Sequence, residues 1–351
     1  MASTGAGARW DIFCRVIDNY GDIGVCWRLA AQLAGSGARV RLVVDDPSAL
    51  EWMAPERTTV APGVAVLRWP GPVDAAEVVI EAFGCDPPEP YVRAMRAVDP
   101  VWINLEYLSA EDYVERSHGL ASPRPDGLRK WFFFPGFTAG TGGLLREPGL
   151  MQRRAAFDRD AWLAGRGLAR RPSERVATLF CYAGAAIGPW LASLGEAPTL
   201  LLLAPGPAQT LVHAAPSSVR LARLPWLEQA EFDHLLWSAD LNAVRGEDSL
   251  VRALWAGAPF LWQAYPQADG AHAAKLEALM STLRLPAGAV AAHRAWNGLA
   301  PWPGLPPLAA WRAAIEAARE RLLAQQDLAT QLRRFVQARR RDGPAREGAC
   351  C

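Results

Sequence analysis

The stretch WDIFCRVIDNYGDIGVCWRLAAQLAGSGARVRLVV, residues 10–44, decides the fold class of this chain. Residues 10–17 form an apolar run of strand length, and RVRLVV at 39–44 forms a second one. Between them, CWRLAAQLAGSG carries apolar residues at helical spacing and ends at a glycine. The chain therefore begins with a predicted strand–helix–strand unit, the building block of a parallel sheet in α/β proteins.

The same alternation continues along the rest of the chain. In the N-terminal half, further runs of strand length lie at 78–83, 101–107 and 130–134, and Ser109 with Asp112 predicts a capped helix start between the last two. In the C-terminal half, the predicted strands are 176–183, 199–205, 219–224, 240–245 and 259–265, and the predicted helices are 188–194, 228–238, 247–256 and 269–282. Each half should therefore hold a mostly parallel sheet with helices on both faces.

The length of 351 residues exceeds what one hydrophobic core comfortably serves, so two domains are expected. The segment 150–174 becomes rich in glycine and arginine, which is typical of a domain boundary. We predict an N-terminal Rossmann-like domain over 1–172 and a second over 173–330. Long helices are predicted over 307–340, and the last segment, 331–351, is a helix with a basic tail that packs back on the N-terminal domain.

Composition narrows the function classes. Lysine plus arginine number 37 against 36 acidic residues, a net charge of +1 that gives no support for nucleic-acid binding. We find neither a basic-then-apolar leader nor about 18 apolar residues in a row, so a cytoplasmic, soluble protein without a membrane partner is expected. The six cysteines form no C-x-x-C pair, and buried thiols are favoured over disulfides or metal ligands. The role of the terminal Cys350 and Cys351 is left open.

The first candidate site is the loop after the first strand. Its residues are Asp18, Asn19, Tyr20, Gly21, Asp22, Ile23 and Gly24. In open α/β sheets, ligands bind on loops at the carboxyl ends of strands, and glycines let the backbone approach a ligand. A helix cap and a solvated acid would explain either Asp alone, but two acids on one such loop favour a function. The pattern G-x-G-x-x-G is absent, which argues against a nicotinamide oxidoreductase.

The second candidate site is the loop after the predicted strand 240–245. Its residues are Arg245, Gly246, Glu247, Asp248 and Ser249. A helix N-terminus with an arginine and a hydroxyl suits a diphosphate. Acids are also common in any first helical turn, so an ordinary capping role stays open, above all for Glu247.

Aromatic residues accompany this second loop. Phe180 and Tyr182 follow one predicted strand, and Trp226 and Phe232 lie near the start of the helix 228–238. A nucleotide base can stack on such rings while Gln229 reads its polar edge. Most aromatic residues in a chain with 15 tryptophans simply fill the core, so this interpretation depends on the neighbouring loop.

Several segments together resemble the family of arginine rhamnosyltransferases that mature elongation factor P. The matching segments are DNYGDIGVCWRLA (18–30), INLEYLSAEDYVE (103–115), FFFPGFTAGTGGLLRE (132–147), LFCYAG (179–184), LNAVRGEDSLVRALWAGAPFLWQ (241–263) and the region DGAHAAKLEAL (269–279). They follow one another over nearly the whole chain, and DNYGDIG and RGEDS are the most specific of them.

This resemblance implies a GT-B fold, in which two facing Rossmann-like domains enclose the active site in their cleft. It implies transfer of L-rhamnose from dTDP-β-L-rhamnose to an arginine of elongation factor P, with inversion at the sugar and without a metal or other cofactor. Asp22 would be the general base, supported by Asp18 and Glu247. The donor would be held by Asn19, Tyr20 and Gly21 at the sugar, by Phe180, Tyr182, Gln229 and Phe232 at the thymidine, and by Arg245, Gly246, Asp248 and Ser249 at the diphosphate.

Elementary chemistry agrees with an arginine acceptor. A guanidinium is a poor nucleophile until it is oriented and loses a proton, and carboxylates are the side chains that grip it. Two alternatives stay open: a metabolic GT-B glycosyltransferase acting on a small molecule or lipid, and a nucleotide-binding protein without catalysis. The residues alone decide neither the sugar, nor the acceptor arginine, nor the oligomeric state.

Overall fold

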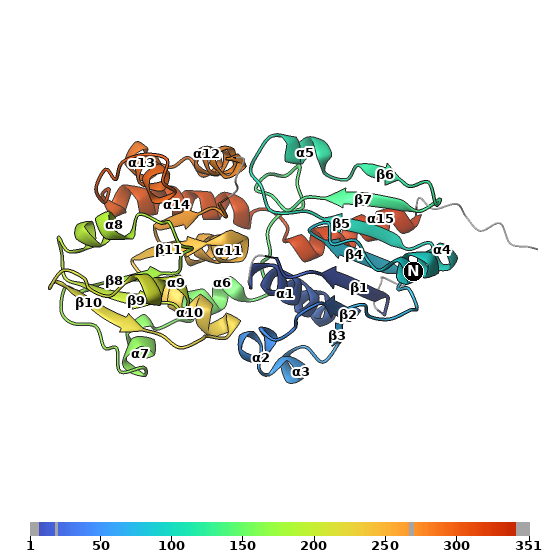
Figure 1. Cartoon of the computed structure of the whole chain (residues 1–351), viewed down its shortest axis with the longest axis horizontal. Helices are drawn as coiled ribbons and strands as arrows, with labels where there is room; N and C mark the ends of the chain where they lie inside the picture. Colours follow the sequence, from blue (N-terminus) through green and yellow to red (C-terminus); the bar gives the residue numbers. More distant parts are fainter. Residues whose placement is uncertain (1–6, 18–19, 267–269, 342–351) are drawn as a thin grey trace, which may run out of the picture.

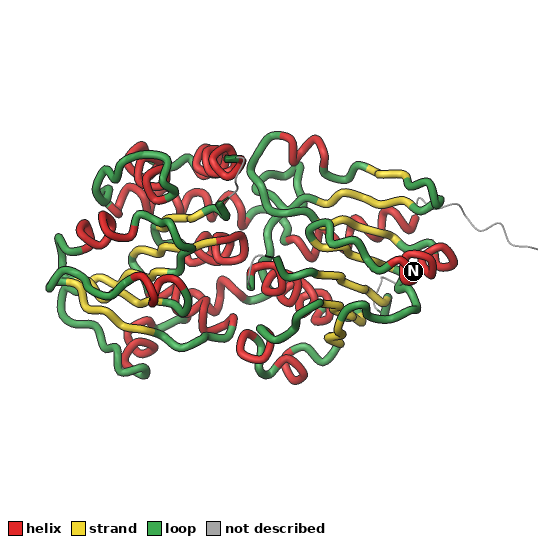
Figure 2. Tube along the Cα trace, viewed as in Figure 1, coloured by secondary structure: helices red, strands yellow, loops and turns green. Residues whose placement is uncertain are grey.

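The structure, a computed structural model, describes residues 7–17, 20–266 and 270–341. Two α/β units lie along the long axis of the molecule, and each is built around its own sheet (Figure 1). Figure 2 shows the sheets as two separate groups of strands, with helices and loops between them. The predicted alternation of strands and helices in two parallel-sheet units is therefore confirmed.

In the described part of the chain the larger sheet has seven strands, in the order β3-β2-β1-β4-β5-β7-β6. They are β1 (Arg9–Cys14), β2 (Arg39–Val44), β3 (Val64–Arg68), β4 (Val78–Ala82), β5 (Val101–Leu105), β6 (Ala121–Pro123) and β7 (Arg129–Phe133). The short edge strand β6 is antiparallel to β7, and the other pairs are parallel. Strand order changes direction between β1 and β4, so a crevice is expected at the carboxyl ends of these two strands.

The smaller sheet is parallel throughout, in the order β10-β9-β8-β11-β12. Its strands are β8 (Arg175–Leu179), β9 (Thr199–Leu203), β10 (Val219–Arg223), β11 (Leu241–Arg245) and β12 (Phe260–Gln263). Here the order changes direction between β8 and β11. Phe180 and Tyr182 follow β8, and the RGEDS sequence spans the end of β11 and the start of α11.

Helices cover both sheets. In the larger unit they are α1 (Gly21–Gly35), α2 (Leu50–Met53), α3 (Arg57–Val60), α4 (Glu89–Val98) and α5 (Tyr113–Ser117). After Phe133 the chain continues through α6 (Leu150–Ala156), α7 (Arg159–Ala164), α8 (Ile187–Leu194), α9 (Pro207–Leu211), α10 (Gln229–Ser238), α11 (Gly246–Ala256), α12 (Ala271–Leu283), α13 (Ala287–Trp296), α14 (Leu308–Leu323) and α15 (Leu328–Arg341). Within the described ranges, no helix is long and apolar enough to cross a membrane.

The last two helices serve different cores. Trp311 and Ile315 of α14 are buried with the residues of the smaller sheet. Leu328, Leu332 and Val336 of α15 are buried with β1 and α1 in the larger unit, so the chain end crosses back to the unit that it built first (Figure 1). The boundaries predicted at residues 172 and 330 stay predictions.

The ends of two strands and the start of one helix differ from the sequence prediction. The predicted strands 10–17 and 176–183 end earlier, at Cys14 and Leu179, because the apolar run continues into the loop after the sheet has ended. The predicted capping box is wrong: Ser109 Oγ accepts a hydrogen bond from the Glu111 N–H, and α5 begins only at Tyr113. Cys14, Cys26, Cys85 and Cys181 are buried free thiols, as predicted.

Candidate active site

The two polar loops predicted from the sequence meet between the two units. The structure differs from the prediction of two loops: residues 21–24 form the start of α1, Arg245 ends β11, and residues 246–249 form the start of α11. The two helices are in contact. At their meeting point the Gln229 side chain donates from Nε2 to the Gly24 carbonyl oxygen at 3.0 Å. A Cβ atom on Gly24 would lie 3.4 Å from that nitrogen and 3.6 Å from Asp248 Oδ2, which is ordinary van der Waals contact, so α1 packs directly against both side chains.

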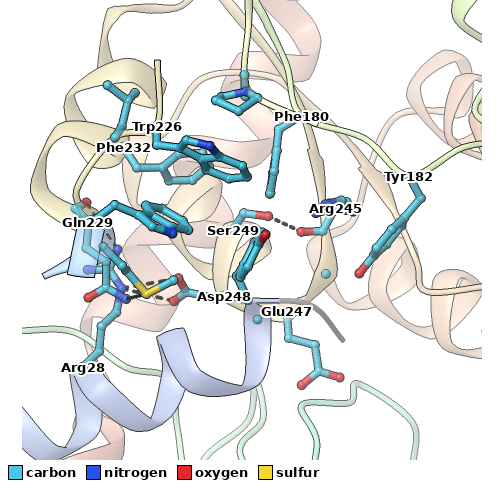
Figure 3. Close-up of a pocket in the computed structure, with 18 residues that line it drawn as sticks. Arg28, Phe180, Tyr182, Trp226, Gln229, Phe232, Arg245, Glu247, Asp248 and Ser249 are labelled. Carbon is cyan, nitrogen blue, oxygen red and sulfur yellow. Dashed lines mark hydrogen bonds and ion pairs between the residues drawn. The ribbon is translucent and has the colours of Figure 1, made fainter. Parts of the chain in front are cut away.

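A cavity of about 760 Å³, including its opening to solvent, lies at this junction. Its lining includes eleven residues predicted from the sequence: Tyr20, Gly21, Phe180, Tyr182, Gln229, Phe232, Arg245, Gly246, Glu247, Asp248 and Ser249 (Figure 3). Of the other predicted site residues, Asp22 lies in a neighbouring cavity, and Asp18 and Asn19 lie outside the described residues. The predicted donor-side residues that the structure describes are thus brought together, and their individual roles stay predictions.

Arg245 is held over two aromatic rings at the end of β11. Its Cζ atom lies 4.5 Å from the ring centroids of both Phe180 and Tyr182, and the residue is 9% exposed. Ser249 Oγ donates a hydrogen bond to the Arg245 carbonyl oxygen (Figure 3). Gly246 follows with φ of +67°, a conformation that favours glycine and lets the chain turn sharply into α11. The result is a cation beside the free N–H groups of a helix N-terminus, a suitable place for an anion.

A cluster of aromatic side chains joins the two units across this cavity. Trp52 of α2 lies 4.5 Å from Trp226, which precedes α10, and Tyr20 packs edge-on against both rings at 5.3 Å. Phe180 packs edge-on against Phe232 at 5.5 Å on the side of the smaller sheet. The sequence reasoning missed Trp52, because α2 carries no motif and its proximity to Trp226 exists only after folding.

A second cavity adjoins the first and contains Asp22. The two cavities share Gly21, Gly246, Glu247 and Asp248 in their linings. Asp22 is only 3% exposed, and its Oδ2 accepts a hydrogen bond from the Ile17 N–H at 2.9 Å. A ligand in one cavity therefore lies next to a ligand in the other.

The wall of the second cavity contains residues that the sequence analysis did not single out. Phe83 stacks on Tyr107 with ring centroids 4.4 Å apart, and its φ of +58° is unusual for a bulky residue. Such backbone strain occurs often at functional sites. Tyr265, His272 and Lys275 complete this wall. Because Phe83 and Tyr107 follow neighbouring strands, only their position after β4 and β5 could have indicated them.

Glu247 connects the two units. Its Oε1 lies 2.5 Å from Lys275 Nζ of α12, and its Oε2 accepts a hydrogen bond from the Leu108 N–H at 2.7 Å. Figure 3 shows its carboxylate pointing away from the aromatic side chains of the first cavity. Both carboxylate oxygens are thus engaged by groups from opposite sides of the junction.

A mostly buried cluster of charged side chains adjoins the first cavity, and its members Arg28 and Asp248 belong to the lining of that cavity. The cluster contains three carboxylates and two guanidinium groups: Glu147, Asp233, Asp248, Arg28 and Arg252. Burial alone would raise the pKa of Glu147, but the charges of Arg252 and Arg28 lower this pKa to about 2. The carboxylate therefore stays ionised at neutral pH.

Comparison with known proteins places this site in context. The sequence profile of the family described as "Elongation-Factor P (EF-P) rhamnosyltransferase EarP" matches residues 10–337. A protein-arginine rhamnosyltransferase of Pseudomonas putida is 46% identical, over 93% of this chain and 98% of that protein. A protein-arginine rhamnosyltransferase of Pseudomonas aeruginosa is 44% identical, over 93% of this chain and 98% of that protein.

Solved structures similar to this chain include members of the same family and fold. The chain matches a structure described as the basis for EarP-mediated arginine glycosylation of translation elongation factor EF-P. The TM-score is 0.68 at 34% identity, over 94% of this chain and 99% of that chain. A spinosyn rhamnosyltransferase matches at a TM-score of 0.51 and 15% identity, over 94% of this chain and all of that chain, a likeness of fold alone. The two facing parallel-sheet units therefore form the GT-B fold, as predicted.

Proposed function

The chain belongs to the elongation factor P rhamnosyltransferase family, and from this premise we propose that it transfers L-rhamnose from dTDP-β-L-rhamnose to an arginine side chain of elongation factor P. The observation that carries the proposal is the contact between two cavities, one aromatic and cationic, the other containing a buried carboxylate. Transfer between two substrates requires such neighbouring sites. We expect the reaction to occur in the cytoplasm, where translation factors act.

The first cavity suits the donor. Phe180 and Phe232 offer faces and edges on which thymine can pack, and Gln229 and Tyr182 lie beside them. Arg245 and the helix N-terminus of α11 would hold the diphosphate, with the backbone N–H groups of Gly246, Asp248 and Ser249 pointing at it from the first turn. Tyr20 and Gly21, with Asn19, would lie at the sugar, next to the second cavity.

The second cavity suits the acceptor. The guanidinium of the incoming arginine would lie beside Asp22, which takes one of its N–H protons. The nitrogen then forms a bond to C1 of rhamnose while the bond between C1 and the diphosphate oxygen breaks. The electron pair of that broken bond leaves with dTDP, so one displacement inverts the anomeric centre and needs no covalent enzyme intermediate. Asp18 and Glu247 would help to hold the acceptor.

The charge that develops on the departing diphosphate needs a counter-charge. Arg245 and the N-terminus of α11 would supply it, and we propose that the reaction needs no metal ion. In the described part of the chain, no group of three or more His, Cys, Asp or Glu side chains is arranged to hold a metal. Titration of dTDP into the protein in excess EDTA tests the proposal, and loss of binding on chelation would contradict it.

Intact-mass analysis of elongation factor P tests the whole function. Incubation with this protein and dTDP-β-L-rhamnose should add one deoxyhexose, and peptide fragmentation should place it on an arginine. The Asp22→Asn variant is the matched control, because it keeps the shape of the site and removes the base. An unmodified factor, combined with sugar transfer to a small molecule or lipid, would instead support the metabolic glycosyltransferase.

A further inference from the structure

The structure assigns a role to Arg28 that the sequence analysis did not consider. Arg28 lies on α1 in the larger unit, yet its side chain lines the donor cavity formed mainly by the smaller unit (Figure 3). The side chain is 6% exposed. We propose that Arg28 is a positioning residue for the donor: it neutralises Asp248 in the first turn of α11 and so keeps that helix N-terminus attractive to a diphosphate.

The contacts of Arg28 converge on the two helices that would hold the donor. Its Nε lies 3.2 Å from Asp248 Oδ1, and its Nη2 donates to the Gln229 carbonyl oxygen at 3.4 Å. Its Nη1 lies 3.1 Å from Glu147 Oε1, and Nη2 lies 3.5 Å from Asp233 Oδ1. One planar guanidinium therefore touches the start of α10, the start of α11 and the segment before α6, which its several fixed N–H donors allow.

The carboxylate of Asp248 would repel a diphosphate bound in this cavity. An acid in a first helical turn favours the helix by itself, but here it lines a cavity proposed to bind a diphosphate. Two negative groups held close together repel each other unless a cation lies between them or beside one of them. Arg28 lies beside Asp248 on the side of α1, so the carboxylate is occupied and α11 can present its N–H groups to the ligand.

The net charge of the whole cluster depends on Arg28. Three carboxylates face two guanidiniums, so the cluster carries one excess negative charge. Arg252 already pairs with the two other carboxylates: its Nε donates to Asp233 at 2.7 Å, and its Nη1 donates to Glu147 at 2.7 Å. Removal of Arg28 would raise the excess to two negative charges, and one of the carboxylates, Asp248, lines the donor cavity.

The experiment measures dTDP affinity by calorimetry and the melting temperature for five variants. Arg28→Met should weaken dTDP binding by about tenfold, the size expected for one charge at a partly buried helix terminus. Arg28→Lys keeps the charge and should stay within about threefold of the unmodified protein. In the double variant Arg28→Met/Asp248→Asn, removal of the unpaired carboxylate should recover most of the lost affinity.

Arg41→Met is the matched control for folding. Arg41 also pairs with a buried carboxylate, Asp11, at 2.5 Å, but it lies outside the donor cavity. This variant should lower the melting temperature and leave dTDP affinity unchanged. A role of Arg28 in folding alone predicts that the double variant binds dTDP no better than Arg28→Met, and that result would overturn the inference. So would unchanged affinity in Arg28→Met, or equal losses in Arg28→Met and Arg28→Lys.

Asp248→Asn by itself keeps the inference testable if Arg28→Met does not fold. It should tighten dTDP binding, because a negative charge leaves the cavity wall while the backbone N–H groups stay, and weaker binding would overturn the inference. The inference rests on the proposed donor site, and the two can fail separately. Absence of dTDP binding by the unmodified protein would refute the donor site, whereas normal binding with the wrong order of variants would refute only the role of Arg28.

Discussion

Lys275 Nζ lies 2.5 Å from Glu247 Oε1, so the glutamate that follows Arg245 and Gly246 is tied to α12 as well as to the larger unit. Each of the two side chains is about one-fifth to one-quarter exposed. A capping residue needs neither partner. This pair therefore gives a direct way to separate the two roles that the sequence left open for Glu247.

Glu247→Gln should lower turnover more than it lowers stability. The amide keeps the shape and can still accept from the Leu108 N–H, but it loses the charge that pairs with Lys275 and would attract a guanidinium. We expect dTDP affinity to stay near that of the unmodified protein. Lys275→Met is the comparison: if Glu247 contacts the acceptor, its loss costs more turnover than the loss of Lys275. Normal turnover in Glu247→Gln would leave Glu247 a structural role alone, in helix capping and in the contact between the two units.

Asp22→Asn should abolish most of the chemical step. Asparagine has nearly the same size and polarity but cannot take a proton from a guanidinium. Turnover should fall by a factor on the order of 10²–10⁴, the usual contribution of a positioned base, while dTDP affinity stays nearly intact. Single-turnover kinetics with saturating donor measures this step. Transfer at the unmodified rate would mean that another group is the base.

Arg245→Ala should weaken donor binding. The guanidinium packs over Phe180 and Tyr182, and its removal takes away both the counter-charge for the diphosphate and a cation–π contact. The expected loss is about 1.5–3 kcal/mol of binding free energy, the range for hydrogen bonds to charged groups. Calorimetry with dTDP measures it. An unchanged dissociation constant would exclude Arg245 from the site.

The lowered pKa of Glu147 predicts how the free energy of unfolding changes with pH. Its pKa is lowered from 4.5 to about 2, against the effect of burial, by Arg252 and Arg28. The unfolded chain therefore binds a proton more readily than the folded one between these values. The stabilisation is fully present above pH 4.5 and is lost as the pH falls towards 2.

The Glu147→Gln variant tests this predicted loss of stability at low pH. Urea unfolding at neutral pH should show the variant to be less stable, because two buried guanidiniums lose one partner. The difference in the free energy of unfolding between the variant and the unmodified protein should shrink as the pH approaches 2. A difference that stays constant with pH would show that Glu147 does not titrate with folding.

Much of this architecture follows from local patterns in the sequence. Apolar runs of strand length and helices closed by glycine gave both sheets, because buried parallel strands leave a strong one-dimensional signal. The strand β3 and the edge strand β6 were missed, since Val64–Arg68 is only partly buried and Ala121–Pro123 is very short. The segments after β1, β8 and β11 were found because ligand sites follow the carboxyl ends of such strands. The segment after β11 is the first turn of α11 and not a loop.

Residues that act through long-range contacts could not be predicted. Arg28 looks like an ordinary polar position of an amphipathic helix, and its partner Asp248 lies 220 residues away. Trp52 likewise gains a role only when α2 meets Trp226. The apparent capping box at Ser109 failed for the opposite reason, because its hydroxyl found a nearer backbone partner two residues on.

The return of α15 to the larger unit sets an order of events during synthesis. Leu328, Leu332 and Val336 belong to the same core as β1 and α1, which leave the ribosome first. The apolar surface that they cover stays open to solvent until α15 has been made, after both sheets. The core of the larger unit, which is translated first, is therefore completed last. A chain cut short after α14 would expose the apolar surface of β1 and α1 to chaperones and proteases, although both sheets would already be complete.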